Sequence, residues 1–524
     1  MTSYLHRYYL VLLLVVVVFS TLFDLASSLS APPSTFTVTD KSSLMAPTTL
    51  SSSISPKIIT ISEKVWRKAA STHSQRIRHL LQPGLLPLEE NTVTNSGSNK
   101  SQQKSRPRQQ QHYVDDWTGL DPINPIYNFL IEYYGLKGAK GPRRLARWAP
   151  NPKLLWDDQK GDGSTCSSAS TAAENDQVYK AAMKASHGLG GILLENANLD
   201  DLGGTLHMRG GIAVPIDDEG DDDKESSSLH GILYNPAVFY NRHLPLNNNN
   251  NDQQHDKERR LQLLKTIAPF QWYTSILKQT LNSEPILHCY GLHEWAMQYH
   301  PEGADPPPSA KYQSNLNLRV SREVINETVE RKGVRCTHVD ALRFFAPAAG
   351  PLNHHGASLE RMDQLRLEQK GCVHAHMDLL KIGLKLQSFI DSDLMVDILE
   401  IALAARKLDV EASPYDATKY GAGIVPIETN EGRKMYRDQQ IVLMQRAEPV
   451  RQRLLDSYET FMMIAFDESL LLDSDEFVGG GKRTSIDNIT AEKVDAEDGP
   501  YVAPERLARA EPGGLPWRKN LIEK

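Results

Sequence analysis

Residues 371–386, GCVHAHMDLLKIGLKL, place two histidines and an aspartate directly after a cysteine in an otherwise apolar run. In a helix, His374 and Asp378 would share one stripe with Lys381 between two apolar flanks, because residues four and seven apart lie on one face. In a strand, His374, His376 and Asp378 would point the same way, which suits a metal ion better. The apolar flanks favour the helix, which turns His376 away from His374. His374 and Asp378 are therefore candidate site residues, and a structural ion pair is the alternative.

Three other segments concentrate ionisable and aromatic side chains. They are HCYGLHEWAMQYH at 288–300, RCTHVDALRFFAPAAGP at 335–351, and ASPYD at 412–416 with PIETNEGR at 426–433. If the segments converge in space, they would line a single pocket. The candidate catalytic residues are Asp340, Asp378, His338, His374, His293 and Glu294. The candidate substrate-binding residues are Arg343, Trp295, Tyr290, Phe344, Tyr415 and Glu428.

These residues can be combined into two kinds of active site. In a metal-free site, Asp340 or Asp378 would act as a base or stabilise a cation, an imidazole would transfer protons, and Arg343 would hold an anion. A metal site needs three or four donors, and the candidates are His293, His338, His374 and Asp378. The chain has no H-E-x-x-H or C-x-x-C pair, so no motif specifies a metal. A divalent metal is therefore a candidate cofactor, and each histidine alone could equally be an ordinary core or surface residue.

Composition narrows the class of partner. The formal net charge is −7 over 524 residues, which argues against a dedicated duplex-binding protein. The local exception is GLKGAKGPRRLARW at 135–148, where basic side chains surround a glycine-rich turn before a helix. A solvated helix face is the favoured interpretation of that segment. Four cysteines in so long a chain do not form a disulfide framework. Three of them lie within two residues of a histidine, which favours free thiols and metal or catalytic use.

The N-terminal region has the pattern of a targeting segment. An apolar run at 8–23 follows His6 and Arg7, and residues 27–62 are rich in Ser, Thr and Pro with Asp40 as the only acid. This two-part pattern resembles the presequence of proteins imported into the plastids of algae with secondary plastids. We therefore expect a plastid location, with secretion as the alternative. The apolar run is shorter than the roughly 20 residues of a membrane helix, so we expect no stable membrane span in the mature form.

Helical periodicity dominates residues 57–467, so we expect a mainly α fold: a large multi-helical single domain with a few short strands and long disordered inserts. Ser62 and Ser392 are the expected caps of two of the helices, and Pro449 lies within the last one. The expected helices cover 62–81, parts of 121–148, 259–281, 392–408 and 431–466, and the expected short strands cover 334–339 and 424–427. Low-complexity inserts are expected as surface loops at about 91–111, 161–175, 217–225 and 245–257. Residues 1–56 are the expected presequence, and 468–524 are the expected mobile tail.

Eight pieces of the chain resemble a family of bacterial and algal proteins commonly labelled 3-methyladenine DNA glycosylases. They are VWRKAASTHSQR, PIYNFLIEYY, RRLARWAP, GLHEWAMQY, RCTHVDALRFF, EQKGCVHAHMDL, ASPYD and PIET. Together they run from about residue 66 to 455, with the inserts as gaps. The resemblance implies hydrolysis of the N-glycosidic bond of an alkylated purine. Asp340 or Asp378 would be the carboxylate facing the sugar, and Trp295, Tyr290, Phe344 or Tyr415 would stack on the base.

The expected function is therefore a glycosylase-like hydrolase acting on damaged purines, with damaged DNA or a small molecule as its substrate. Two alternatives stay open. One is a metal-dependent enzyme acting on a small plastid metabolite. The other is a non-catalytic plastid assembly factor, for which the histidines and carboxylates would be dispensable. The sequence does not specify an oligomeric state.

Overall fold

A computed structural model describes residues 57–87, 117–157, 169–171, 176–198, 210–215, 229–241, 253–304, 316–331 and 333–466. The chain divides into two compact units, Met1–Ser55 and Pro56–Lys524, and all described residues belong to the second. The presequence, the inserts at 91–111 and 217–225 and the tail at 468–524 lie outside the described residues. Among the described residues, no helix is long and apolar enough to cross a bilayer.

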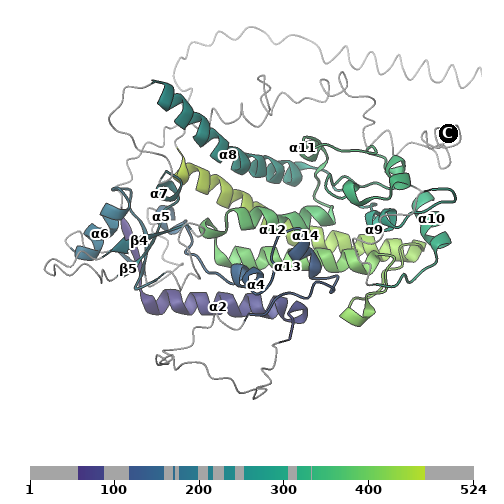
Figure 1. Ribbon diagram of the computed structural model, residues 1–524, viewed down its shortest axis with the longest axis horizontal. Helices are drawn as coiled ribbons and strands as arrows, with labels where there is room; N and C mark the ends of the chain where they lie inside the picture. Colours follow the sequence, from purple (N-terminus) through teal and green to yellow (C-terminus); the bar gives the residue numbers. More distant parts are fainter. Residues whose placement is uncertain are drawn as a thin grey trace, which may run out of the picture. The chain divides into compact units, whose positions relative to one another are not determined.

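Three helices form the centre of the second unit and confirm the prediction of a mainly α fold. They are α12 (Val373–Lys385), α13 (Ser392–Ala412) and α14 (Asn430–Ala465), and each contacts the other two. Figure 1 shows them side by side. α8 (Gln253–Asn282) packs against α14, and α2 (Glu63–Leu81) packs against α13. Most of α13 is buried, and each fully buried Leu or Ile contributes roughly 1.5–3 kcal/mol.

The contact between α12 and α13 depends on a glycine. A Cβ atom added at Gly383 would lie 3.0 Å from Ile398 and 3.4 Å from Met395, both on α13. The absence of a side chain therefore lets the two helices approach closely. The cap of α13 differs from the expected one: the Asp391 side chain accepts a hydrogen bond from the backbone N–H of Asp393, and Ser392 bonds to Ala149 instead. The prediction was therefore wrong by one residue, since aspartate is as good a cap as serine.

Shorter helices connect these long ones and carry several site residues. The α-helices are α3 (Asn128–Glu132), α4 (Lys140–Leu145), α5 (Leu154–Asp157), α6 (Gln177–Ala185), α7 (Pro236–Asn241), α9 (Leu292–Met297), α10 (Arg322–Glu330) and α11 (Asp363–Leu367). The 3₁₀ helices are Gln82–Gly84, Leu342–Phe344, Pro347–Leu352, Gln387–Phe389 and Thr418–Tyr420. In the basic segment before and within α4, Arg144 donates hydrogen bonds to the Leu384 carbonyl and the Gln387 side chain. The Arg144 side chain thus connects α4 to the end of α12. The prediction that this basic segment is a solvent-exposed helix face is therefore wrong at Arg144.

A five-stranded sheet is the largest feature that the sequence did not predict. Its order is β2 (Ala169–Thr171), β1 (Ile58–Ile61), β3 (Gly191–Glu195), β5 (Leu229–Tyr234), β4 (Gly211–Pro215). β1 and β3 are parallel, and the other neighbours are antiparallel. α6 packs against β1, β4 and β5. Apolar residues of α6 and of the sheet form a small second core that includes Ala182 and Leu193.

Four predictions of local structure need correction. The expected strand at 334–339 is only an isolated bridge between Val334 and Asn353, and residues 424–427 form no strand. Each is a short apolar piece with too few neighbours for a ladder. The expected insert at 161–175 contains β2, and the one at 245–257 overlaps α8, which begins at Gln253. Polar composition hid both elements.

The buried His73 of α2 predicts how stability changes with pH. Its Nε2 lies 2.9 Å from the Leu145 carbonyl, which can only accept, so Nε2 carries the hydrogen. Burial lowers the pKa of His73, despite that hydrogen bond and the nearby Asp393 and Asp391, and Arg76 lowers it further. Below about pH 6.5 the unfolded chain therefore binds a proton that the folded chain does not. The contribution of His73 to stability should be constant above that pH and fall below it, by at most about 1.4 kcal/mol per pH unit.

The check is urea unfolding of the full chain between pH 7.5 and 5.5. His73→Gln keeps a donor for Leu145 but does not titrate, so we expect a shallower loss of stability with falling pH than in the unsubstituted chain. His79→Gln, on the exposed side of the same helix, is the matched control and should leave the slope unchanged. Equal slopes for His73→Gln and the unsubstituted chain would contradict this assignment.

Candidate active site

The structure brings together four predicted site residues that are far apart in the sequence. His293 comes from α9, His338 from the loop before the 3₁₀ helix Leu342–Phe344, and His374 and Asp378 from the first half of α12. The ring of His374 lies 4.3 Å from that of His293 at 62°, and 4.7 Å from that of His338, to which it is nearly parallel. The helical interpretation of the segment is confirmed, and His376 points elsewhere: its ring contacts Arg451 of α14.

A pocket with a cavity volume of about 130 Å³ lies beside these histidines. Its ionisable lining is Glu294, His338, Asp340, Arg343, His374, Asp378, Lys381 and Arg406. Its aromatic lining is Phe129, Tyr133, Tyr134 and Phe344. Tyr133 and Phe344 meet edge to face with ring centroids 5.9 Å apart. Charged groups therefore occur in the pocket together with apolar ring surface, which is the usual composition of a small-molecule site.

The two aspartates of the pocket have opposite environments. Asp340 contacts three cations, with atom-to-atom distances of 2.9 Å to Arg343, 3.7 Å to Lys381 and 3.8 Å to Arg361. Burial opposes ionisation of Asp340, but these cations and His338 outweigh it and lower its pKa. Burial raises the pKa of Asp378. His338 and Lys381 oppose this effect and Glu368 and Asp340 add to it, and the pKa stays raised overall. At any given pH, Asp378 is therefore protonated more readily than Asp340.

His338 links the pocket to a buried carboxylate. Its Nε2 lies 4.0 Å from Asp378, and its Nδ1 lies 3.7 Å from Oε1 of Glu368, which is 2% exposed. Burial lowers the pKa of His338, but Glu368, Asp378 and Asp340 outweigh burial, and the pKa is raised overall. For His374 the result is the opposite: burial, with His293 and His338 beside it, lowers its pKa well below the ordinary value. The two parallel rings thus differ in how readily they accept a proton.

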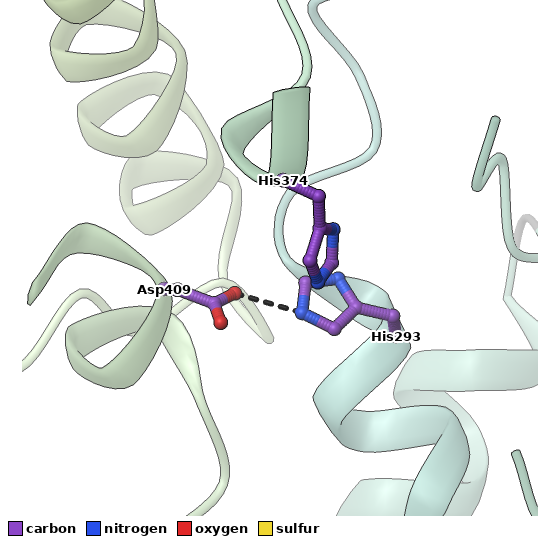
Figure 2. A group of neighbouring side chains, drawn as sticks. All are labelled: His293, His374 and Asp409. Atoms are coloured by element: carbon purple, nitrogen blue, oxygen red, sulfur yellow. Dashed lines mark ion pairs between the residues drawn. The ribbon is translucent and has the colours of Figure 1, made fainter. Parts of the chain in front are cut away.

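His293 belongs to a second group of side chains beside the pocket. Figure 2 shows three residues of this region, His293, His374 and Asp409. Its Nε2 lies 2.8 Å from Oδ1 of Asp409, a fully buried residue of α13. Arg406, one turn earlier, donates to Oδ2 of Asp409 at 2.7 Å, to Glu294 at 2.9 Å and to the Pro125 carbonyl at 3.0 Å. Burial opposes ionisation of Asp409, but the contacts with His293 and Arg406 hold its pKa below the ordinary value.

The predicted metal candidates do not form one ligand set. Among the described residues, His293 and His374 group with Asp409, whereas His338 and Asp378 group with Asp340. A third group joins His338 to Glu368 and Cys372. Asp409, Arg406 and Glu368 were not among the predicted site residues. The available signal was the oppositely charged pair Arg406 and Asp409, which are one helical turn apart within the mostly apolar residues 392–412.

Four predicted substrate-binding residues lie outside the pocket lining. Trp295 is fully buried and donates its indole N–H to the Ala412 carbonyl, and Tyr415 is bonded to Gln298 in the core. Glu428 forms a two-pronged pair with Arg319. Tyr290 lines a separate cavity together with Arg335 and Arg433. These four residues were predicted from their positions beside other candidate residues. In the fold, however, their side chains are buried in the core or bind other partners.

The three described cysteines are free thiols and none lines the pocket. Burial raises the pKa of Cys336 to about 12 and also raises the pKa of Cys289. A thiol must lose its proton to act as a nucleophile. These cysteines are therefore unsuited to act as catalytic nucleophiles.

No family model matches the chain, no curated protein matches it, and no solved structure matches it.

Proposed function

We propose that this chain is a hydrolase that cleaves the N-glycosidic bond of an alkylated purine, with the pocket beside His338 and His374 as its active site. The supporting observation is the pair Asp340 and Asp378, whose carboxylate oxygens lie within 4.8 Å of one another and of a His338 nitrogen. Their pKa values are shifted in opposite directions. Glycoside-hydrolysing sites use such pairs, because one carboxyl group must donate a proton or hydrogen bond while the other stays ionised.

The two carboxyl groups then take different roles. Asp340, the more readily ionised, would face the sugar, stabilise its positive charge and accept the proton of the attacking water. The bond from the sugar carbon to the base nitrogen breaks, its electron pair leaves with the base, and the water oxygen bonds to that carbon. A positively charged alkylated purine is neutralised by that electron pair and needs no proton. Asp378 would donate a hydrogen bond to the base, with His338 at 4.0 Å as its proton partner.

The size and lining of the pocket support a small substrate group. A cavity of about 130 Å³ lies below the roughly 300–1,000 Å³ of sites for drug-sized ligands. It therefore suits one ring system, such as a single base turned out of a nucleic acid or carried by a nucleoside. Tyr133 and Phe344 provide ring surface for such a base.

The test is release of free base by the purified full chain, measured by chromatography on alkylated DNA and on a panel of alkylated and unmodified purine nucleosides. We expect release from at least one of the two substrate types, and which one reacts identifies the substrate class. If neither releases base, the hydrolase proposal is wrong.

A metal-dependent enzyme acting on a small plastid metabolite is the second candidate, and the grouping of His293, His374 and Asp409 favours it. Chelator-sensitive activity of the purified chain on metabolites, with no base release, would support it. The third candidate, a non-catalytic assembly factor, requires His338→Ala and Asp378→Ala to leave the cellular function intact.

A further inference from the structure

We infer that His293, His374 and Asp409 form a binding site for one divalent transition-metal ion of the Zn²⁺ or Fe²⁺ type. Two imidazole nitrogens and one carboxylate oxygen are the donors that such ions prefer. The site extends beyond the proposed hydrolase and does not depend on it, because its evidence comes from a different group of side chains.

The distances between the donor atoms suit a shared ion. One donor atom from each of the three residues lies within 4.8 Å of the other two. Metal–ligand bonds of about 2.1 Å place tetrahedral donors about 3.4 Å apart and opposite donors about 4.2 Å apart. To share a tetrahedral ion, Nε2 of His293 and Oδ1 of Asp409, now 2.8 Å apart, need to separate by about 0.6 Å. Figure 2 shows them converging from α12, α9 and α13.

The contact between His293 and Asp409 is unusual for a simple ion pair. Nε2 and Oδ1 lie 2.8 Å apart, yet neither atom has a hydrogen bond of acceptable geometry. The side chain of His293 is 4% exposed and that of Asp409 is fully buried. Two buried polar atoms that approach without bonding each other would both be satisfied by one ion bound to both. A metal ion accepts a lone pair from each.

The surroundings of Asp409 resemble the outer shell of a metal site. Arg406 binds Oδ2 and leaves Oδ1 as the oxygen that faces His293. Such an outer partner fixes the orientation of a carboxylate ligand. Glu294 offsets the charge of Arg406 at 2.9 Å, so with neutral imidazoles the two carboxylates and one guanidinium leave the group one negative charge. That charge favours a cation.

The pocket provides a route for the ion. His374 lines the pocket as well as contacting His293, so the site is reached through the same opening as the proposed substrate.

The experiment measures metal directly and needs no substrate. The purified full chain is analysed for bound metals by mass spectrometry, stripped with chelator, and titrated with Zn²⁺ by calorimetry. We expect close to one equivalent of Zn²⁺ per chain. His374→Gln and Asp409→Asn should each weaken binding by at least about 100-fold, more than loss of an outer-shell partner does. Circular dichroism shows whether each variant is folded.

Two controls separate this site from its neighbours. His376→Gln removes a buried histidine of the same helix that contacts Arg451 instead, and it should retain Zn²⁺ binding. His338→Gln removes the histidine shared by the other two groups of candidate ligands and should change affinity only a few-fold. If Asp409→Asn does not fold, Cu²⁺-loaded unsubstituted chain and His374→Gln are compared by electron paramagnetic resonance, where the variant should lose one nitrogen ligand. Absence of stoichiometric binding, or binding lost with His338 but kept without His374, would overturn the site.

Discussion

Asp378→Leu and Asp340→Asn should each lower kcat/KM for base release by at least about 100-fold, or about 2.7 kcal/mol in transition-state stabilisation. Leucine and asparagine are similar in size to aspartate, so the pocket keeps its shape. Asp378→Leu removes the hydrogen-bond donor, a carboxylic acid that burial makes easier to protonate. Asp340→Asn removes a negative charge that three cations hold in its ionised form. The assay is base release on whichever substrate the unsubstituted chain cleaves.

Asp416→Asn is the matched control for both substitutions. Asp416 is exposed, and its side chain accepts hydrogen bonds from Thr418 in the same turn, so base release should stay within about twofold of the unsubstituted chain. An activity loss as large as that of the pocket variants would point to a general effect on folding. If Asp340→Asn and Asp378→Leu retain most of the activity, the assignment of the two carboxylates is wrong even if the chain proves to be a hydrolase.

Arg406→Met should destabilise the fold by about 3–5 kcal/mol, because it removes one partner of a buried ion-pair group. The guanidinium binds Glu294, Asp409 and the Pro125 carbonyl, and all three side chains of the ion-pair group are less than a tenth exposed. Methionine fills much of the volume but leaves two buried carboxylates without a countercharge. Domains are typically stable by only about 5–15 kcal/mol. The loss should therefore be measurable by urea unfolding of the full chain from which metal has been removed with chelator.

The exposed pair of Arg446 and Glu400 is the control for this substitution. The two side chains lie 2.7 Å apart and are about half exposed, so Arg446→Met should cost about 1 kcal/mol or less. Adding Glu294→Gln to Arg406→Met removes one of the unpaired charges and should restore part of the stability. A loss below about 1 kcal/mol for Arg406→Met, or no recovery in the double variant, would show that buried charge is not the cause.

His374 belongs to both groups of side chains and connects the two proposals. On one side it contacts His293 of the inferred metal site, and on the other it stacks in parallel on His338 beside Asp378. An ion bound to His374 would fix the ring that His338 packs against. Metal removal is therefore expected to loosen the proton partner of Asp378 even if the ion takes no direct part in the reaction.

The sequence by itself determined the parts of this protein that depend on local periodicity. Apolar residues repeat with helical spacing through α2, α8, α13 and α14, and this pattern alone predicted a mainly α fold. The same pattern identified residues 373–385 as a helix, and this fixed His374 and Asp378 on one side and His376 on another. Residue type was sufficient to select His293, Glu294, His338, Asp340 and Arg343 as candidates, because clustered ionisable groups in apolar segments need partners.

Only the tertiary structure decided which partners those groups have. Asp409 follows His293 by more than a hundred residues in the sequence and stands in a helix that reads as apolar core, so no local pattern joins the two. The sheet was hidden for a similar reason: its short strands lie between low-complexity inserts, and each is stabilised by neighbours that are distant in sequence. Trp295 and Tyr415 occupy predicted segments, yet packing buries them in the core. Side-chain direction and long-range pairing are set by the whole fold. They place Asp340 and Asp378 in the pocket lining and Asp409 outside it.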